Sequence, residues 1–145
     1  MTAVAVFNAH PARRRRREET MRAVRTVLAG EGCKRAAISV VFVDDQFMTK
    51  MNRAYLRHRR TTDVMSFPLG EKGTIEGEVY VNLDSAVRQA RTYGESYARE
   101  SMRLVIHGTL HLLGYDDRTT GKRKTMKQRE ELYVSRVKGT RAQDR

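Results

Sequence analysis

The sequence contains one cysteine, Cys33, two prolines and no tryptophan. A lone cysteine excludes an internal disulfide and any zinc site built from several cysteines, and it is typical of a reducing compartment. No apolar run approaches the roughly 20 residues that a transmembrane helix requires, and the N-terminus lacks the apolar stretch of a signal peptide. We therefore predict a cytoplasmic protein that does not contact a membrane.

Acidic residues are scarce relative to basic ones. The 145 residues include 29 Lys and Arg against 17 Asp and Glu, which gives a formal net charge of +12. This balance is typical of proteins that bind a polyanion, although it also occurs in very soluble proteins without that role. The length suits one hydrophobic core. We predict a single domain over residues 1–137 and a disordered tail at residues 138–145.

Apolar periodicity predicts four strands and five helices in the order β-α-β-α-β-β-α-α-α. The strands are expected at residues 4–7, 38–43, 64–67 and 78–82, and the helices at 13–29, 45–56, 84–93, 96–113 and 120–137. Asp44 or Asp45 is the expected cap of the second helix, and Asp84 that of the third. The second strand is almost continuously apolar, which predicts cover on both faces. This pattern indicates an α+β fold in which a small mixed sheet of about four strands is covered by helices.

Two histidines lie one helical turn apart in the segment His107-Gly-Thr-Leu-His111. Residues at i and i+4 share one face of a helix, so the two imidazoles can chelate one cation. The helix is otherwise apolar, and a metal ion would satisfy two ring nitrogens that are costly to bury alone. The alternative is that each histidine is simply hydrogen-bonded within the protein. We favour metal binding, with one zinc ion per chain.

A third ligand is expected in the turn after this helix. Gly114 can adopt a positive φ, which would bring the chain back toward the histidines. Asp117 follows His107 by ten residues. This is the spacing of the His-x-Glu-x-x-His-x-x-Gly-x-x-His zinc peptidases, with Asp117 in the third ligand position. Those peptidases use the glutamate after the first histidine as general base, and here Gly108 stands there, so peptidase activity is not expected.

Three blocks of the sequence resemble the YbeY family of endoribonucleases and rRNA maturation proteins. They are HGTLHLLGYDD from His107, MNRAYLRHRRTTDVMSFP from Met51 and GEVYVN from Gly77. The blocks keep the family's order and spacing, so the resemblance covers nearly the whole chain. It implies a zincin-like metal helix with ligands at His107, His111 and Asp117.

Asp117 departs from this family, because most members have histidine at the third position. A carboxylate is an ordinary zinc ligand, but a set of two histidines and one carboxylate also suits other divalent metals. The alternative is that Asp117 or Asp116 only caps the final helix.

A second departure lies in the basic segment. Many relatives carry arginine where this chain has Leu56, and proline where it has Thr61. The charge of that arginine is expected from Arg57, Arg59 or Arg60, and the sequence does not select among them. These side chains would neutralise charge on a phosphate in the transition state. The alternative is a solvated loop that gathers RNA electrostatically.

Further side chains are expected near the site or the RNA. Asp63 and Ser66 follow the basic segment and would orient water, or else Asp63 caps a turn and Ser66 pairs with the backbone. Arg13 and Arg14 belong to a basic run on the first helix and are expected to contact RNA phosphates. Tyr115 is expected to pack against the motif rather than to stack on a base.

The resemblance implies a metal-dependent, single-strand-specific endoribonuclease that acts in small-subunit rRNA maturation and ribosome quality control. RNA, the ribosome's small subunit and rRNA are the expected partners. The alternative is a non-catalytic RNA- or ribosome-binding assembly factor with a structural metal. A closed site with four ligands would favour this alternative, whereas the three visible ligands leave a position open. The sequence predicts neither the cleavage site nor the oligomeric state.

Overall fold

The computed structural model describes residues 2–56, 63–71 and 73–137, and within them four strands form one sheet. The elements are β1 (Thr2–Asn8), α1 (Arg17–Gly30), β2 (Ala36–Val43), α2 (Asp45–Met51), a π-helical turn η1 (Asn52–Leu56), β3 (Val64–Pro68), β4 (Ile75–Asn82), α3 (Leu83–Tyr93), α4 (Tyr97–Leu112) and α5 (Thr120–Arg136). The strand order is β1-β2-β4-β3, with β3 antiparallel to β4 and the other neighbours parallel. The predicted α+β class and element order are confirmed.

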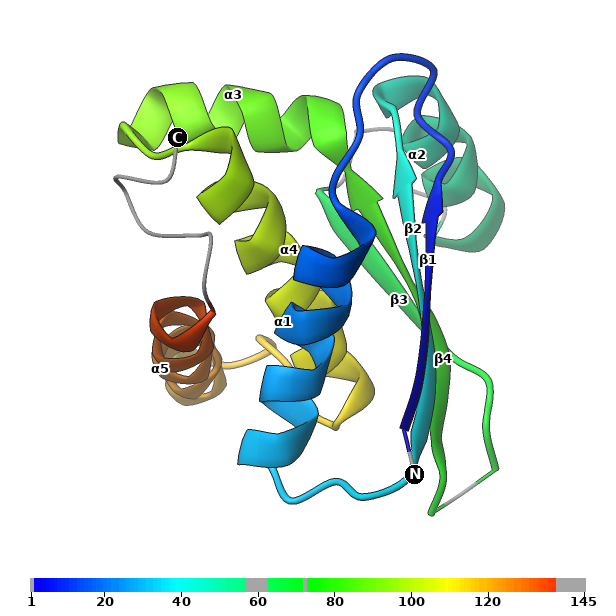
Figure 1. The fold of residues 1–145 in the computed structure, drawn as a ribbon, viewed down its shortest axis with the longest axis vertical. Coiled ribbons are helices and arrows are strands. Elements are labelled where there is room, and N and C mark those ends of the chain that lie inside the picture. The colour runs from blue at the N-terminus through cyan, green and yellow to red at the C-terminus, as the bar shows by residue number, and fades with distance from the viewer. Residues whose placement is uncertain (1, 57–62, 72, 138–145) are drawn as a thin grey trace.

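Helices cover one face of the sheet, and Figure 1 shows α1 and α4 on that side with α5 packed beyond them. Along β2, Ile38 and Phe42 are buried whereas Ala37 is exposed. The opposite face is partly covered by α2, where the ring of Phe47 stacks on Tyr80 at 5.8 Å. The prediction that β2 is covered on both faces is correct only toward the end of the strand, where Val41 and Val43 pack in a cluster with Met48, whereas Ala37 near its start is exposed.

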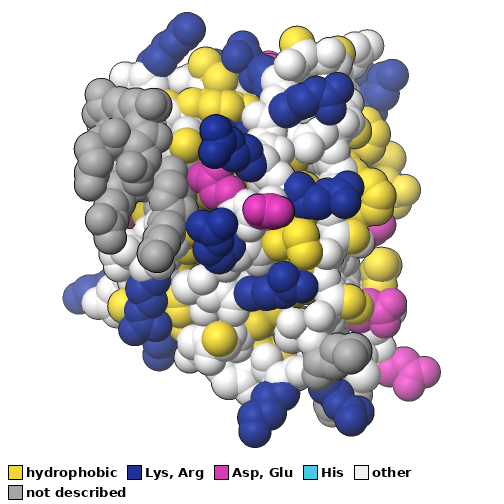
Figure 2. All heavy atoms as spheres, viewed as in Figure 1, with side chains coloured by type: hydrophobic (Ala, Val, Ile, Leu, Met, Phe, Trp, Pro, Cys, Tyr) yellow, Lys and Arg dark blue, Asp and Glu magenta, His cyan; other side chains and the backbone are white. Residues whose placement is uncertain are grey.

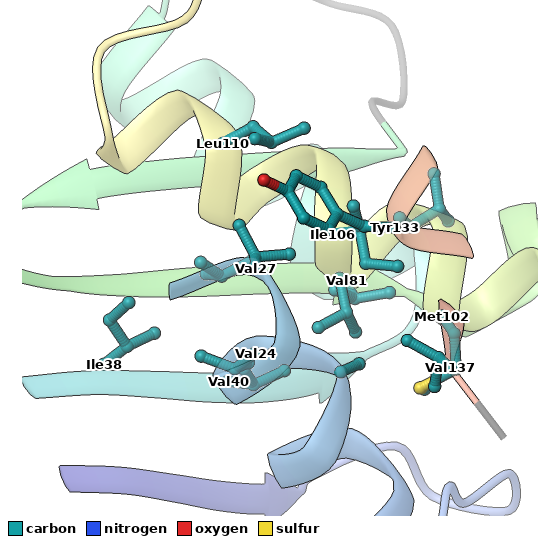
Figure 3. Close-up of a cluster of buried hydrophobic side chains, with 14 of the residues drawn as sticks. Val24, Val27, Ile38, Val40, Val81, Met102, Ile106, Leu110, Tyr133 and Val137 are labelled. Atoms are coloured by element: carbon teal, nitrogen blue, oxygen red, sulfur yellow. The ribbon is translucent and has the colours of Figure 1, made fainter. Parts of the chain in front are cut away.

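The main core lies between the sheet and the helices, and Figure 3 shows its side chains. Val24 and Val27 of α1 meet the buried face of the sheet, and Ile106 and Leu110 of α4 lie beside them. Tyr133 of α5 closes the cluster and is fully buried. The metal-motif helix α4 is therefore held between the sheet and α5.

The basic segment before α1 is a loop rather than helix. The Asn8 side chain accepts a hydrogen bond from the Arg15 N–H (3.0 Å) and donates to the Arg15 carbonyl (3.1 Å). The ring of His10 accepts from the N–H of Arg13 at 2.8 Å. These bonds hold the backbone outside helical geometry, so the predicted helix start at Arg13 is wrong and α1 begins at Arg17.

The cap of α3 also differs from the prediction. The Asn82 side chain accepts from the N–H groups of Asp84 (3.0 Å) and Ser85 (3.3 Å), so Asn82 rather than Asp84 is the N-cap. Asp84 instead accepts from the His10 ring at 2.8 Å and from the Asp45 N–H at 3.0 Å. Its carboxylate therefore joins the segments that follow β1, β2 and β4.

Within the described ranges, no helix is both long and apolar enough to cross a membrane. The single domain over residues 1–137 stays a prediction. The tail predicted to be disordered, residues 138–145, lies outside the described residues.

Candidate metal centre

The two motif histidines lie on one face of α4. Ser96 caps this helix by accepting from the Arg99 N–H at 3.0 Å. Apolar residues of α4 are buried in the core, while His107 and His111 are only partly buried. Their ring centroids lie 4.8 Å apart, and the rings meet edge to face. The predicted i, i+4 pair therefore presents both imidazoles to one place.

The turn after α4 brings Asp117 to the same place. Gly114 has φ 104°, and its N–H donates to the His111 carbonyl at 3.0 Å. The N–H of Tyr115 donates to the Leu110 carbonyl at 3.1 Å, which closes the end of the helix. Among the described residues, His107, His111 and Asp117 form a group that could hold a metal ion, with ligand atoms all within 4.8 Å of one another. The expected role of Gly114 is confirmed.

The neighbouring aspartate is engaged elsewhere. Asp116 accepts from the Arg118 N–H at 3.0 Å and lies 3.5 Å from the Lys122 ammonium. The Arg118 N–H and the Lys122 charge lower the pKa of the Asp116 carboxyl. Thr119, and neither aspartate, is the N-cap of α5. Of these two aspartates, Asp117 is therefore the one that lies with the histidines in the possible metal-binding group.

The electrostatics of the pair suit a metal ion. Burial, and next the neighbouring His107, lower the pKa of His111, so its ring stays neutral near pH 7. Metals bind the neutral imidazole. The carboxylate of Glu130, on α5, lies 3.7 Å from His107 Nδ1, which is close to the imidazole but beyond hydrogen-bond distance. Sequence reasoning missed Glu130, because nothing in the mostly polar α5 indicates which residue faces α4.

Gly108 has a packing role that explains the absence of a side chain. A Cβ atom there would lie 2.3 Å from Val79 Cγ1 and 3.0 Å from Val64 Cγ2. The hydroxyl of Ser66 donates to the Gly108 carbonyl at 2.8 Å. Ser66 thus lies beside the helix that carries the histidines and pairs with its backbone, which is the alternative stated for it from the sequence.

Asp63 is tied to α3. Its two carboxylate oxygens accept from the Ser85 hydroxyl, at 2.7 Å, and from the Gln89 amide. Asp63 also lines a cleft of about 460 Å³ to which Glu100 and Arg103 of α4 contribute. The cleft thus borders α4 at Glu100 and Arg103, and His107, His111 and Asp117 are not among the residues that line it.

The predicted RNA-contacting arginines are only partly within the described chain. Arg57, Arg59 and Arg60 lie outside the described residues. Arg13 and Arg14 are exposed on the loop before α1, and Arg13 Nε donates to Asp84 at 3.1 Å. Figure 2 shows Lys and Arg side chains spread over the face of the molecule on which α1 lies.

Tyr115 packs against the main core, as expected. Its hydroxyl donates to Glu31 at 2.6 Å, and the Tyr133 hydroxyl donates to the other oxygen of the same carboxylate. Burial opposes ionisation of Glu31, but these two bonds and the charge of Arg129 outweigh it and lower the pKa of Glu31. Burial and the bond to Glu31 raise the pKa of Tyr133 to about 12.

Known proteins are similar to this chain in sequence and in fold. The family model described as endoribonuclease YbeY matches residues 7–138. The endoribonuclease YbeY of Chlorobium luteolum is 38% identical over 130 residues, which cover 88% of this chain and 95% of that protein. The one of Pelotomaculum thermopropionicum is 42% identical over 129 residues, which cover 83% of this chain and 85% of that protein.

A solved structure agrees with this match. The solution structure of a Thermotoga maritima protein superposes with a TM-score of 0.65 at 25% identity, and covers 94% of this chain and 89% of that one. The sequence match and the shared fold together span all the elements from α1 to α5. The chain belongs to the endoribonuclease YbeY family.

Proposed function

We propose that this chain is a metal-dependent endoribonuclease that hydrolyses phosphodiester bonds in single-stranded RNA. The observation that carries the proposal is the group formed by His107, His111 and Asp117, whose ligand atoms lie within 4.8 Å of one another in a chain of this family. Its biological substrate is rRNA of the small ribosomal subunit, during maturation and quality control in the cytoplasm.

Zinc is the proposed ion. Two imidazoles and one carboxylate are a common zinc set, and three protein ligands leave a fourth position for water or substrate. The same set admits other divalent ions because of its carboxylate. A divalent cation bound there supplies Lewis acidity and activates water near neutral pH.

The chain's own residues have two proposed tasks beside the ligands. Arg57, Arg59 and Arg60 neutralise the scissile phosphate as negative charge develops on it. The Ser66 hydroxyl donates a hydrogen bond to the Gly108 carbonyl, and its oxygen keeps lone pairs that can accept hydrogen bonds from water or from a ribose hydroxyl. Asp63 has a carboxylate fixed by α3 and orients water at the edge of the cleft.

RNA is gathered by the overall positive charge, to which the exposed Arg13 and Arg14 contribute. The rival function is an RNA-binding assembly factor with a structural metal. Within the described residues the metal group has three members, which favours an open, catalytic site over a closed one.

The test compares purified wild type, His111→Ala and Asp117→Ala for metal content and for cleavage of a single-stranded rRNA fragment. We expect both variants to lose bound metal and cleavage. RNA binding should persist and stay sensitive to salt, because phosphate contacts do not depend on the metal. The identically prepared His111→Ala protein also controls for contaminating nuclease, so undiminished cleavage by that variant would refute the mechanism.

A second assay addresses the metallopeptidase alternative. Gly108 cannot act as a base and has no room for a side chain, so we expect no metal-dependent cleavage of denatured protein substrates. Peptide cleavage that disappears in His111→Ala would contradict this expectation.

A further inference from the structure

The proposed ligand Asp117 is held on a short connection between α4 and α5, and its side chain is exposed. Local hydrogen bonds fix the two ends of this connection. Gly114 and Tyr115 bond back to α4, and Thr119 caps α5 by accepting from the Lys122 N–H at 3.1 Å. These bonds link the connection only to the helices that flank it.

A contact from a distant part of the chain adds a further constraint. The Tyr115 hydroxyl donates to Glu31, which is 84 residues away in sequence, at 2.6 Å. The second oxygen of Glu31 accepts from the Tyr133 hydroxyl and lies 3.6 Å from an Arg129 nitrogen. One carboxylate thus joins the end of α1, the Asp117 connection and α5.

Glu31 is itself well fixed. Its N–H donates to the Val27 carbonyl at 2.9 Å where α1 ends. Its side chain is only 13% exposed. The preceding Gly30 lies against the ring of Tyr133, since a Cβ at Gly30 would be 2.4 Å from Tyr133 Cε1. α1 and α5 therefore meet at close range, and the carboxylate is held where they meet.

We propose that Glu31 is a positioning residue for the metal centre, which holds Tyr115 so that the Asp117 carboxylate meets the two imidazoles. The inference rests on the proposed function, because it requires Asp117 to bind the metal. Groups that hydrogen-bond a metal ligand directly typically contribute 10- to 100-fold to metal affinity, and Glu31, which acts on Asp117 through Tyr115, is expected to contribute less. A merely structural Glu31 would instead affect only the stability of the fold.

Tyr115→Phe and Tyr133→Phe form a matched pair, since each removes one hydroxyl from Glu31 and keeps the ring. The measurements are Zn²⁺ affinity, by competition with a chromophoric chelator without RNA, and thermal unfolding of the metal-free proteins. We expect Tyr115→Phe to weaken Zn²⁺ binding by up to about 10-fold, which is less than the loss of a direct ligand partner causes. Tyr133→Phe should lower the unfolding temperature at least as much as Tyr115→Phe does, but it should weaken Zn²⁺ binding less than Tyr115→Phe does. Affinity losses that merely follow the losses of stability would overturn the inference.

A double-mutant cycle with Asp117→Ala isolates the coupling between Tyr115 and the ligand. In the Asp117→Ala background the measurement is the weaker Zn²⁺ affinity left to His107 and His111, titrated at high Zn²⁺ concentration, and Tyr115→Phe should not lower it further. Glu31→Gln, which keeps an acceptor oxygen, should bind Zn²⁺ better than Glu31→Ala. Fully additive effects would overturn the inference even if RNA cleavage still depends on His111. Coupling without any RNA cleavage would overturn the proposed function and leave the inference standing.

Discussion

At the scale of single residues, one glycine sets the distance between the metal helix and the sheet. Gly108 lies so close to β3 and β4 that even a methyl group would overlap Val79. The adjacent His107 takes its position from this contact, because it precedes Gly108 on the same helix. The packing of Gly108 against the sheet and the position of the His107 side chain are therefore coupled.

Gly108→Ala is expected to destabilise the protein, although alanine normally favours a helix. The new methyl group must displace Val79 or move α4, and overpacking of this kind typically costs about 1–3 kcal/mol. Gly121→Ala is the matched control, because a Cβ there meets nothing within 4 Å. Urea unfolding of both variants tests this, and equal stability of Gly108→Ala and wild type would contradict it.

The grouping of His107, His111 and Asp117 was predictable because its determinants are local. A spacing of four residues places His107 and His111 on one face in any helix, and Gly114 marks the turn that returns Asp117. Glu31 and Glu130 were not predictable. Glu31 meets Tyr115, and Glu130 meets His107, only through the packing of α1 and α5, and sequence periodicity does not specify which helices meet.

At the scale of elements, Asp84 joins the segments that follow three parallel strands. Its carboxylate accepts from His10 and Arg13 before α1, and from the N–H of Asp45 at the start of α2. Burial opposes ionisation of Asp84, but these hydrogen bonds outweigh it and lower its pKa from 3.8.

Asp84→Asn should therefore lose stability in a pH-dependent manner. A lowered pKa means that the ionised carboxylate stabilises the folded state above pH 3.8, and that this stability is lost as the pH falls through the folded-state value. We expect a loss of about 1–3 kcal/mol near neutral pH. The gap to wild type should narrow below pH 3.8 in urea unfolding. Glu76→Gln, which changes an exposed carboxylate, serves as the control. The prediction would be contradicted if Asp84→Asn and wild type differed in unfolding free energy by the same amount near neutral pH and below pH 3.8.

Strands and helices were largely predictable, but two helix starts were not. Among the described residues, apolar periodicity located each strand and α-helix but not the π-helical turn that replaces the end of the helix predicted at residues 45–56. The start of α1 depends on side-chain bonds from Asn8 and His10. The cap of α3 was assigned to Asp84 although Asn82 takes it. Both residue types favour caps, and only the contacts of Asp84 with other segments decide between them.

At the scale of the whole molecule, a net charge of +12 provides a field that attracts RNA whatever its sequence. Such attraction weakens with salt in proportion to the number of phosphates contacted. If the basic segment with Arg57, Arg59 and Arg60 contacts RNA phosphates, its charges contribute directly to the salt dependence of binding. Charges elsewhere on the surface then act only through the net charge.

Replacing Arg57, Arg59 and Arg60 together by alanine should weaken RNA binding and reduce its salt slope by roughly 2. Metal content should be unchanged. The control replaces three exposed arginines elsewhere, Arg22, Arg25 and Arg91, which gives the same change in net charge. Fluorescence anisotropy across a salt series separates the two variants. Identical slopes would show that only net charge matters and would reject a contact role for the segment.

The close seating of α4 on the sheet also limits which side chains position 108 can carry. A zinc peptidase carries a glutamate where this chain has Gly108, and here that position faces Val79 and Val64. A glutamate at this position would overlap both valines, so this scaffold could take up a catalytic glutamate only if smaller residues replaced them at the same time.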